Sequence, residues 1–194
     1  MPRPDVSDER IPQILEAALK VFNRKGLAAS RMEDIARQAK LSIGGVYWYY
    51  KSKDDVVLAI MDKVIDEDVA ILRNLLNEPA TVQERLRKYL QIGVQESMQY
   101  TTLTYELYTL SKYDAKVRHH IQTYIEHYIN VLTELIQQGM NQKEFRQANA
   151  RSIAFTIAAL YEGTLELVTL DSSIGNIEEM LNQSLDIIFK EIVK

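Results

Sequence analysis

The chain has 194 residues, 46% of them hydrophobic, and a formal net charge of −4, an ordinary composition for a globular protein. It has no cysteine, which excludes disulfide frameworks, thiolate nucleophiles and thiolate metal sites. No stretch resembles a signal peptide or reaches the ~18–20 apolar residues of a membrane span, so we expect a cytoplasmic protein.

Apolar residues recur at three- and four-residue spacing along the whole chain, which predicts an all-α fold. The first helix is expected over about residues 10–24, with Gly26 just after its end. Ser30 and Glu33 have the spacing of a capping box, in which each side chain accepts a hydrogen bond from the other residue's backbone N–H. This spacing predicts a short second helix that is capped by Ser30 and ends at about residue 39.

Ser42 is expected to cap a third short helix over about residues 43–49. Three short helices with a tight connection between the last two predict a helix-turn-helix, whose later helix enters the DNA major groove. The charge distribution agrees, because residues 1–53 carry ten Lys and Arg against six Asp and Glu, while the remaining residues carry thirteen against twenty-one. The alternative is a plain helical subdomain with a solvated charged face.

The third helix begins with Gly44 and Gly45, which each cost about 1 kcal/mol relative to alanine inside a helix. Such a cost suits a helix that must approach DNA closely and offer its free N–H groups to phosphate. Tyr47 and Trp48 are expected to point towards DNA, where a hydroxyl can donate to phosphate and a ring can pack on sugar or a thymine methyl. Either ring taken singly is equally well explained as a core residue.

The other large side chains of this helix, Val46, Tyr49 and Tyr50, lie three and four positions apart, so we expect them to face the core. Lys51 and Lys53 follow at the start of the next helix, where their charge can neutralise the DNA backbone. This combination favours a DNA-reading helix over a helix that serves only for packing.

Residues 30–36 (SRMEDIA) and 39–53 (AKLSIGGVYWYYKSK), together with Gly26, resemble the DNA-binding domain of TetR-family transcriptional regulators. The resemblance covers roughly residues 10–57. It departs from the family pattern at Tyr50, where phenylalanine is usual, and at Lys40, where glycine is usual. Lys40 is expected either to take a strained left-handed conformation or to belong to a different turn. The DNA-binding residues that we predict are Ser30, Arg31, Met32, Ser42, Ile43, Gly44, Gly45, Tyr47, Trp48, Lys51 and Lys53.

The rest of the chain predicts further helices, over about residues 52–77, 82–100, 104–112, 115–141, 149–170 and 176–193. The resemblance implies two domains: a helix-turn-helix domain over 1–53, linked by the long helix from about 52, and a larger helical domain over 54–194. The larger domain is expected to carry the ligand and dimer contacts.

The last two predicted helices are apolar on more than one side, which exceeds what one packed face needs. The surplus favours a homodimer interface, since a helix-turn-helix dimer reads two half-sites related by a twofold axis. A well-buried hairpin within one subunit is the alternative. The predicted interface residues are Ile153, Leu160, Leu165, Val168, Ile177, Leu181, Leu185 and Ile188.

Tyrosines are abundant in the middle of the chain, and rings with polar tips suit an apolar pocket that holds a ligand by a few hydrogen bonds. Gly93 and Ser97, four residues apart, leave room for such a cavity. Few charged residues occur on these inner faces, which indicates a neutral or aromatic effector. The predicted pocket residues are Leu90, Gly93, Val94, Ser97, Tyr105, Tyr108, Tyr124, Tyr128, Ile157 and Tyr161.

The three histidines, His119, His120 and His127, lie on one predicted helix without a convergent carboxylate, so we expect no metal site. No phosphate-binding loop, nucleophile elbow or paired-carboxylate motif is present, and we expect neither catalysis nor a cofactor. The predicted function is a one-component regulator, most simply a repressor that binds a palindromic operator as a dimer and is released by a small-molecule effector. The alternative is a helical adaptor that acts by protein contact.

Overall fold

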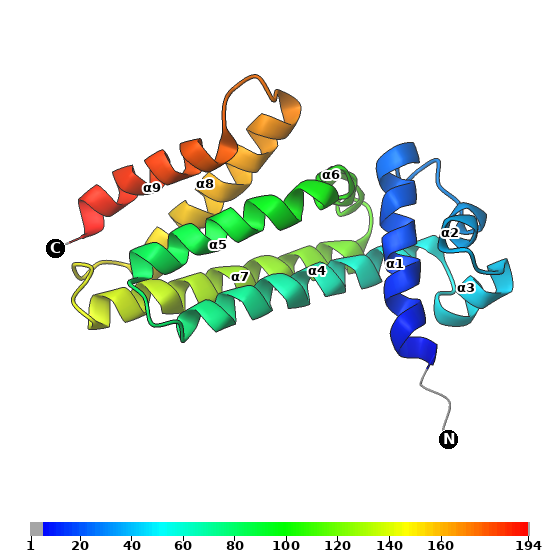
Figure 1. The fold of residues 1–194 in the computed structure, drawn as a ribbon, viewed down its shortest axis with the longest axis horizontal. Coiled ribbons are helices and arrows are strands. Elements are labelled where there is room, and N and C mark those ends of the chain that lie inside the picture. The colour runs from blue at the N-terminus through cyan, green and yellow to red at the C-terminus, as the bar shows by residue number, and fades with distance from the viewer. Residues whose placement is uncertain (1–5, 194) are drawn as a thin grey trace. The chain divides into compact units, whose positions relative to one another are not determined.

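The computed structural model describes residues 6–193, apart from the side chains of residues 6–8 and 96–98. Within this range the chain is helical, with one isolated bridge between Phe145 and Val193 and no strand, which confirms the all-α prediction (Figure 1). The helices are α1 (Val6–Lys25), α2 (Met32–Ala39), α3 (Ile43–Tyr49), α4 (Lys53–Leu76), α5 (Val82–Ser97), η1 (Met98–Tyr100), α6 (Thr101–Leu110), α7 (Ala115–Asn141), α8 (Ala150–Leu170) and α9 (Ile177–Ile192).

Most helix boundaries follow their sequence signals. Asn149 and Asn176 cap α8 and α9, each accepting a hydrogen bond from a backbone N–H in the first turn. The segment over residues 82–100 ends in the short 3-10 turn η1, and the following helix starts at Thr101 rather than at residue 104.

The chain forms two compact units. Unit 1 consists of Met1–Val64 and Gln99–Ile121, and unit 2 consists of Ile65–Met98 and Gln122–Lys194. Helix α4 therefore supplies residues to both units.

Unit 1 packs α1, α2, α3, the first part of α4 and α6 around one apolar core that includes Phe22, Ile35 and Val46. Helix α1 is also tied to the end of α2, because the Gln13 side-chain amide donates to the Ala39 carbonyl at 2.7 Å. Most of the core comes from side chains with almost no exposed surface: Ile14, Leu15, Ala18, Phe22, Ile35, Ala36, Val46, Val56, Val57 and Ile60.

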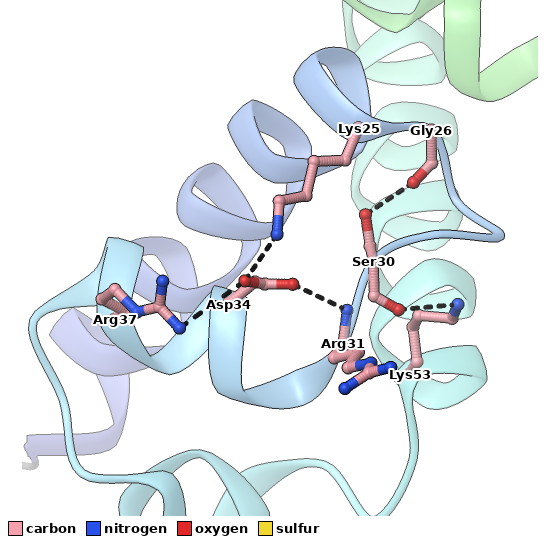
Figure 2. Close-up of polar contacts among 7 residues, drawn as sticks. All are labelled: Lys25, Gly26, Ser30, Arg31, Asp34, Arg37 and Lys53. Atoms are coloured by element: carbon pink, nitrogen blue, oxygen red, sulfur yellow. Dashed lines mark hydrogen bonds and ion pairs between the residues drawn. The ribbon is translucent and has the colours of Figure 1, made fainter.

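Asp34, a buried carboxylate in the first turn of α2, joins α1 to α2 (Figure 2). One carboxylate oxygen accepts from the Lys25 ammonium at 2.7 Å, and the other accepts from the Arg31 N–H at 3.2 Å. The Arg37 guanidinium lies 3.8 Å from the same carboxylate. The hydrogen bond from Lys25 lowers the pKa of Asp34 below its ordinary value, with further lowering by the Arg31 N–H.

The predicted capping box on Ser30 and Glu33 is wrong by one residue. The N-cap of α2 is Arg31, and Asp34 is the acidic partner that accepts from its N–H. The Ser30 hydroxyl instead donates to the Gly26 carbonyl at 2.6 Å (Figure 2). Glu33 and Asp34 are adjacent in this turn, and only Asp34 faces the Lys25 ammonium on α1. This contact determines which of the two acidic residues caps α2 and therefore where the helix begins.

Unit 2 packs α5, the second part of α4, most of α7, α8 and α9 around a second apolar core. Helices α8 and α9 run antiparallel, joined by the loop at residues 171–176 (Figure 1). Arg85 is buried in this unit, where its guanidinium donates to the Leu75 and Leu76 carbonyls and to the Gln138 side chain. The largest fully buried side chains of the unit are Leu72, Leu86, Tyr89, Leu132, Leu135, Ile136, Met140, Phe145 and Ile157.

Asp34→Asn is expected to lower the melting temperature at neutral pH, because the Lys25 ammonium loses its charged partner. A carboxylate whose folded pKa is lowered contributes stability above its unfolded pKa of about 3.9, and this contribution is lost as the pH falls through the folded value. The difference between variant and wild type should therefore shrink in acid. Thermal unfolding followed by circular dichroism across a pH series measures this, with the exposed neighbour Glu33→Gln as the matched control. Equal melting temperatures for wild type and Asp34→Asn would contradict the assignment.

Candidate functional sites

The turn before α3 has the predicted geometry. Lys40 adopts the left-handed conformation, with φ 56° and ψ 38°, and the Leu41 N–H donates to the Ala36 carbonyl at 2.9 Å. Ser42 then caps α3, since its hydroxyl accepts from the Gly45 N–H at 3.0 Å. A lysine in place of the usual glycine is therefore accommodated without a change in the turn.

The side chains of α3 divide as the helical spacing predicts. Val46 is completely buried, and Tyr49 and Tyr50 are half-buried against the core of unit 1. Tyr47 is 41% exposed and Trp48 is 79% exposed. These two exposed rings lie next to each other on a helix of only seven residues.

The two glycines of α3 have different surroundings. A Cβ atom on Gly44 would have no neighbour within 4 Å, so the helix surface is open at this position. A Cβ atom on Gly45 would lie 3.1 Å from the Ser42 hydroxyl that forms the cap. Gly44 therefore leaves the first turn accessible, while Gly45 keeps the capping bond undisturbed.

Of the three basic side chains predicted to contact DNA, two are exposed and one is used within the fold. Arg31 and Lys51 are exposed, and the Lys51 ammonium donates to the Tyr47 carbonyl at 2.9 Å, which places its charge beside α3. The Lys53 ammonium donates to the Ser30 carbonyl (Figure 2). It also donates to the Leu27 carbonyl, so that it ties the start of α4 to the turn before α2.

The prediction that the Ser30 and Met32 side chains contact DNA is corrected by their burial. Ser30 is 3% exposed and its hydroxyl is used by Gly26, while Met32 is 5% exposed and belongs to the core of unit 1. Both residues hold α2 in place. The remaining predicted residues, Arg31, Ser42, Ile43, Gly44, Tyr47, Trp48 and Lys51, are exposed, and Gly45 and Lys53 are half-exposed.

A second candidate site lies in unit 2, where four tyrosines from three helices meet. The Tyr124 and Tyr128 rings of α7 stack with centroids 5.9 Å apart, and Tyr89 of α5 lies 6.0 Å from Tyr128 and 6.2 Å from Tyr161 of α8. Asp68 of α4 accepts from the Tyr89 hydroxyl at 3.0 Å and from the Tyr124 hydroxyl at 3.3 Å. We call Asp68 and these four rings the tyrosine cluster.

Two carboxylates give the tyrosine cluster an acidic character. Burial raises the pKa of Asp68, although the hydrogen bonds from the two tyrosines oppose this. Burial, together with the smaller effect of the charges on Asp68 and Glu166, raises the pKa of the neighbouring Glu162 to about 7. The expectation that charged residues are few on these inner faces is therefore wrong here.

Seven of the ten predicted pocket residues lie in the core of unit 2, and the cavity expected at Gly93 is filled. A Cβ atom on Gly93 would come within 2.5 Å of the Tyr161 hydroxyl, so this glycine allows close packing rather than an open space. Tyr105 and Tyr108 belong to unit 1, and the side chain of Ser97 lies outside the described residues. The seven are Leu90, Gly93, Val94, Tyr124, Tyr128, Ile157 and Tyr161.

Sequence reasoning missed Tyr89, Asp68 and Glu162. A signal existed for Tyr89, which precedes Gly93 by one helical turn and therefore shares its face. Asp68 stands among apolar positions of α4, and its burial depends on hydroxyl partners from α5 and α7 that the sequence of α4 does not reveal.

The predicted dimer residues fall into two groups. Leu165, Leu181 and Leu185 are at most 8% exposed in the core of their own subunit, so their side chains leave little surface for a contact with a partner. Helical spacing shows that a helix is apolar on two sides but not which side faces its own subunit. The others, Ile153, Leu160, Val168, Ile177 and Ile188, are half-buried, and exposed apolar residues accompany them at Phe155, Leu167, Leu170, Ile174 and Ile187.

Helix α8 is long and apolar enough to cross a membrane by length and composition, with one third of that stretch buried. A helix packed on one side and apolar on the other has the same composition. No group of three His, Asp or Glu side chains within the described part of the chain is arranged to hold a metal ion. The His120 ring nitrogen lies 3.4 Å from the Asp62 carboxylate, which gives it a pairwise contact within unit 1.

Residues 14–60 match the family model for bacterial regulatory proteins of the tetR family. The fatty acid metabolism regulator protein of Bacillus subtilis is 25% identical over 138 residues, which cover 70% of this chain and 70% of that protein. The HTH-type transcriptional regulator HbdR of an Aromatoleum strain is 38% identical over 63 residues, which cover 32% of this chain and 28% of that protein.

Solved structures share the fold over nearly the whole chain. A putative transcriptional regulator from Saccharomonospora viridis in complex with choline has a TM-score of 0.84 at 22% identity and covers 97% of this chain and 99% of its own. The regulator FadR from Bacillus subtilis in complex with stearoyl-CoA has a TM-score of 0.76 at 20% identity and covers 91% and 96%. Residues 14–60 therefore carry a helix-turn-helix segment of the tetR type, and the chain as a whole is similar to proteins that are themselves named transcriptional regulators.

Proposed function

We propose that the protein is a homodimeric repressor that binds a palindromic operator through α3 of each subunit and releases it when a small molecule binds in unit 2. The observation that carries the proposal is the exposed surface of α3, where Tyr47, Trp48 and the open first turn at Gly44 stand on a helix fixed by the core. Such a surface suits the major groove.

The chemistry of this surface divides into positioning and reading. Arg31 and Lys51 place positive charge beside α3, where they can neutralise phosphates. The Tyr47 hydroxyl can donate to a phosphate oxygen, and the Trp48 ring can pack on sugar or a thymine methyl. With so few hydrogen-bond donors aimed at base edges, we expect the shape and deformability of the operator to contribute to its recognition.

The homodimer is supported by the exposed apolar side chains of α8 and α9. Leu167 and Leu170 on α8, and Ile187 on α9, are 54%, 70% and 70% exposed. An apolar face of this kind is typical of a subunit interface, and a twofold dimer presents two reading helices to two half-sites.

Release by a ligand requires that the ligand prefers the conformation that does not fit DNA, since equal affinity for both conformations shifts nothing. Two structurally similar regulators, one in complex with choline and one with stearoyl-CoA, support a small-molecule ligand, and we place it in unit 2. Helix α4 supplies Asp68 to the tyrosine cluster and also residues to unit 1, which gives the ligand a helix through which to act. We expect a cytoplasmic protein without catalytic activity or a bound cofactor.

A mobility-shift series at increasing salt, with the DNA upstream of the protein's own gene and with a site selected from random sequence, tests the function. Sequence-selective binding in dimer units is expected, and the logarithm of the affinity should fall linearly with the logarithm of the salt concentration as phosphate contacts release counterions. Absence of selective binding in both DNA sets would contradict the proposal and favour the adaptor alternative.

Gly44→Glu is expected to lower operator affinity by about tenfold or more, because it brings a carboxylate to the helix end that faces phosphate. The open space at Gly44 lets the variant fold. Gly44→Gln is the matched control, since it has the same shape without the charge and should bind more tightly than Gly44→Glu. Equal affinities of the two variants, measured by fluorescence anisotropy of labelled operator, would place this turn away from the DNA backbone.

Leu167→Glu is expected to weaken dimerisation by about tenfold or more, because an apolar interface cannot solvate the new charge. Thr169→Glu is the control, since it introduces the same side chain at an exposed position two residues along α8, which points to another side of the helix. Light scattering coupled to size-exclusion chromatography gives the mass of each variant. A dimeric Leu167→Glu variant with wild-type affinity would place the interface elsewhere.

A further inference from the structure

The tyrosine cluster holds more negative charge than its surroundings compensate. Asp68 receives hydrogen bonds from the Tyr89 and Tyr124 hydroxyls, which are neutral donors. The half-buried Glu162 faces the charges of Asp68 and Glu166, and no cation or hydrogen-bond donor among the described residues lowers its pKa. The buried arginine of this unit, Arg85, is held by two backbone carbonyls and Gln138. A carboxylate withdrawn from water without a cation is costly to ionise, so a cation from solution would be stabilised at this place.

A second observation comes from Tyr128. Its ring is 2% exposed and stacks on Tyr124 at an interplanar angle of 8°. Its hydroxyl is buried and forms no well-aligned hydrogen bond with a described residue, and the Tyr89 side chain is the one hydrogen-bonding neighbour that acts on its pKa. A buried hydroxyl loses its hydrogen bonds to water, and without a partner this loss is not compensated. The Tyr128 hydroxyl also lies near the carboxylates of Asp68 and Glu162. The tyrosine cluster therefore offers ring faces, two carboxylates and an unused hydroxyl together.

We propose that the effector is an organic cation with an ammonium group, which the rings of Tyr89, Tyr124, Tyr128 and Tyr161 surround and the carboxylates of Asp68 and Glu162 neutralise. The inference rests on the proposed function, because it names the ligand class of the same unit. Aromatic faces attract ammonium groups through the negative face of the ring, and the attraction grows when both partners are withdrawn from water. The alternating ring and carboxylate surfaces favour an alkylated ammonium over a small metal ion, which prefers several oxygen ligands.

Entry of the cation must part the rings, because they already contact one another and the Tyr161 hydroxyl fills the space at Gly93. The four rings and Asp68 belong to α4, α5, α7 and α8, so a bound ligand acts on all four helices at once. Asp68 stands on α4, the helix that also supplies residues to unit 1. A change in the position of α4 is the structural response that this geometry favours.

The affinity for the cation should depend on pH through Glu162. The titratable groups that face it are Asp68 of α4, Tyr124 and Tyr128 of α7, and Glu166 of α8, and all of them are acidic or neutral. A cation binds the ionised carboxylate, and the pKa of Glu162 is about 7. Affinity is therefore expected to rise as the pH increases from about 6 to about 8 and to level off above that.

Calorimetric titration of the full-length protein with choline, with benzyltrimethylammonium and with the neutral carbon isostere of choline tests the proposal. The isostere has a tert-butyl group in place of the trimethylammonium group, so only the charge differs. At least one cation is expected to bind about tenfold or more tightly than the isostere. Failure of both cations to bind at millimolar concentration, or equal binding of choline and the isostere, would overturn the proposal.

Glu162→Gln separates the charge from the shape of the site. It is expected to weaken cation binding by about tenfold at pH values above 7 and to remove most of the pH dependence. Its fold should be retained, because the substitution removes a carboxylate with a raised pKa, which destabilises the folded state above neutral pH. Glu134→Gln, an exposed glutamate of α7, is the matched control and should bind as the wild type does. Unchanged cation affinity in Glu162→Gln would contradict the assignment.

Measuring operator binding in the absence of ligand, beside cation binding, tests the regulatory function and the ligand class separately. A protein that binds operator selectively but binds no cation remains a regulator with another class of effector. A protein that binds the cations but no selected DNA keeps the ligand assignment and loses the regulatory function. Release of the operator by the tighter cation, and not by the isostere, is the result expected when both hold.

Discussion

The contact between the Lys25 ammonium and the Asp34 carboxylate joins α1 to α2, the helix from which the proposed DNA-reading helix α3 takes its position. A helix of seven residues with one fully buried side chain cannot hold its own position, because isolated short helices are unstable in water. Helix α3 therefore takes its place from α2, through the left-handed turn at Lys40. Asp34 fixes α2 to α1 and orders its first turn at Arg31. The exposure of Tyr47 and Trp48 follows from this support.

Unit 2 shows the opposite arrangement of charge. In unit 1 the buried carboxylate has a cation and a backbone donor within the chain, and the pKa of Asp34 is lowered. In unit 2 the carboxylates of Asp68 and Glu162 have only neutral donors or none, and their pKa values are raised. A paired carboxylate serves the fold, whereas an unpaired one at a ring-lined site indicates a ligand. This contrast supports an organic cation over the neutral effector that the sequence alone favoured.

Local features were predictable from the sequence because their causes are local. The cap at Ser42, the turn at Lys40 and the inward and outward sides of α3 follow from residue type and helical spacing over a few positions. The choice between Glu33 and Asp34 in the first turn of α2 was not predictable, because it depends on Lys25 of another helix. The burial of Asp68 was not predictable for the same reason, since its hydroxyl partners come from α5 and α7.

Which apolar side of α8 and α9 faces the core of the subunit was likewise not predictable from the sequence. Both helices are apolar on two sides, and spacing cannot tell which side faces the subunit's own core. Leu185 is completely buried there, whereas Ile187 is 70% exposed. Only the packing of α9 against α5 and α8 separates the inner from the outer residues.

The intrinsic fluorescence of Trp48 tests the central claim most directly, because it is the protein's single tryptophan and lies on the exposed face of α3. Free protein should show the emission of a water-exposed indole that acrylamide quenches readily. On saturation with selected operator, followed independently by anisotropy of labelled DNA, the account predicts a shift of the emission and strong protection from acrylamide, with no such change on non-specific DNA at high salt. A complex in which Trp48 remains as accessible as in the free protein would contradict the placement of α3 on DNA.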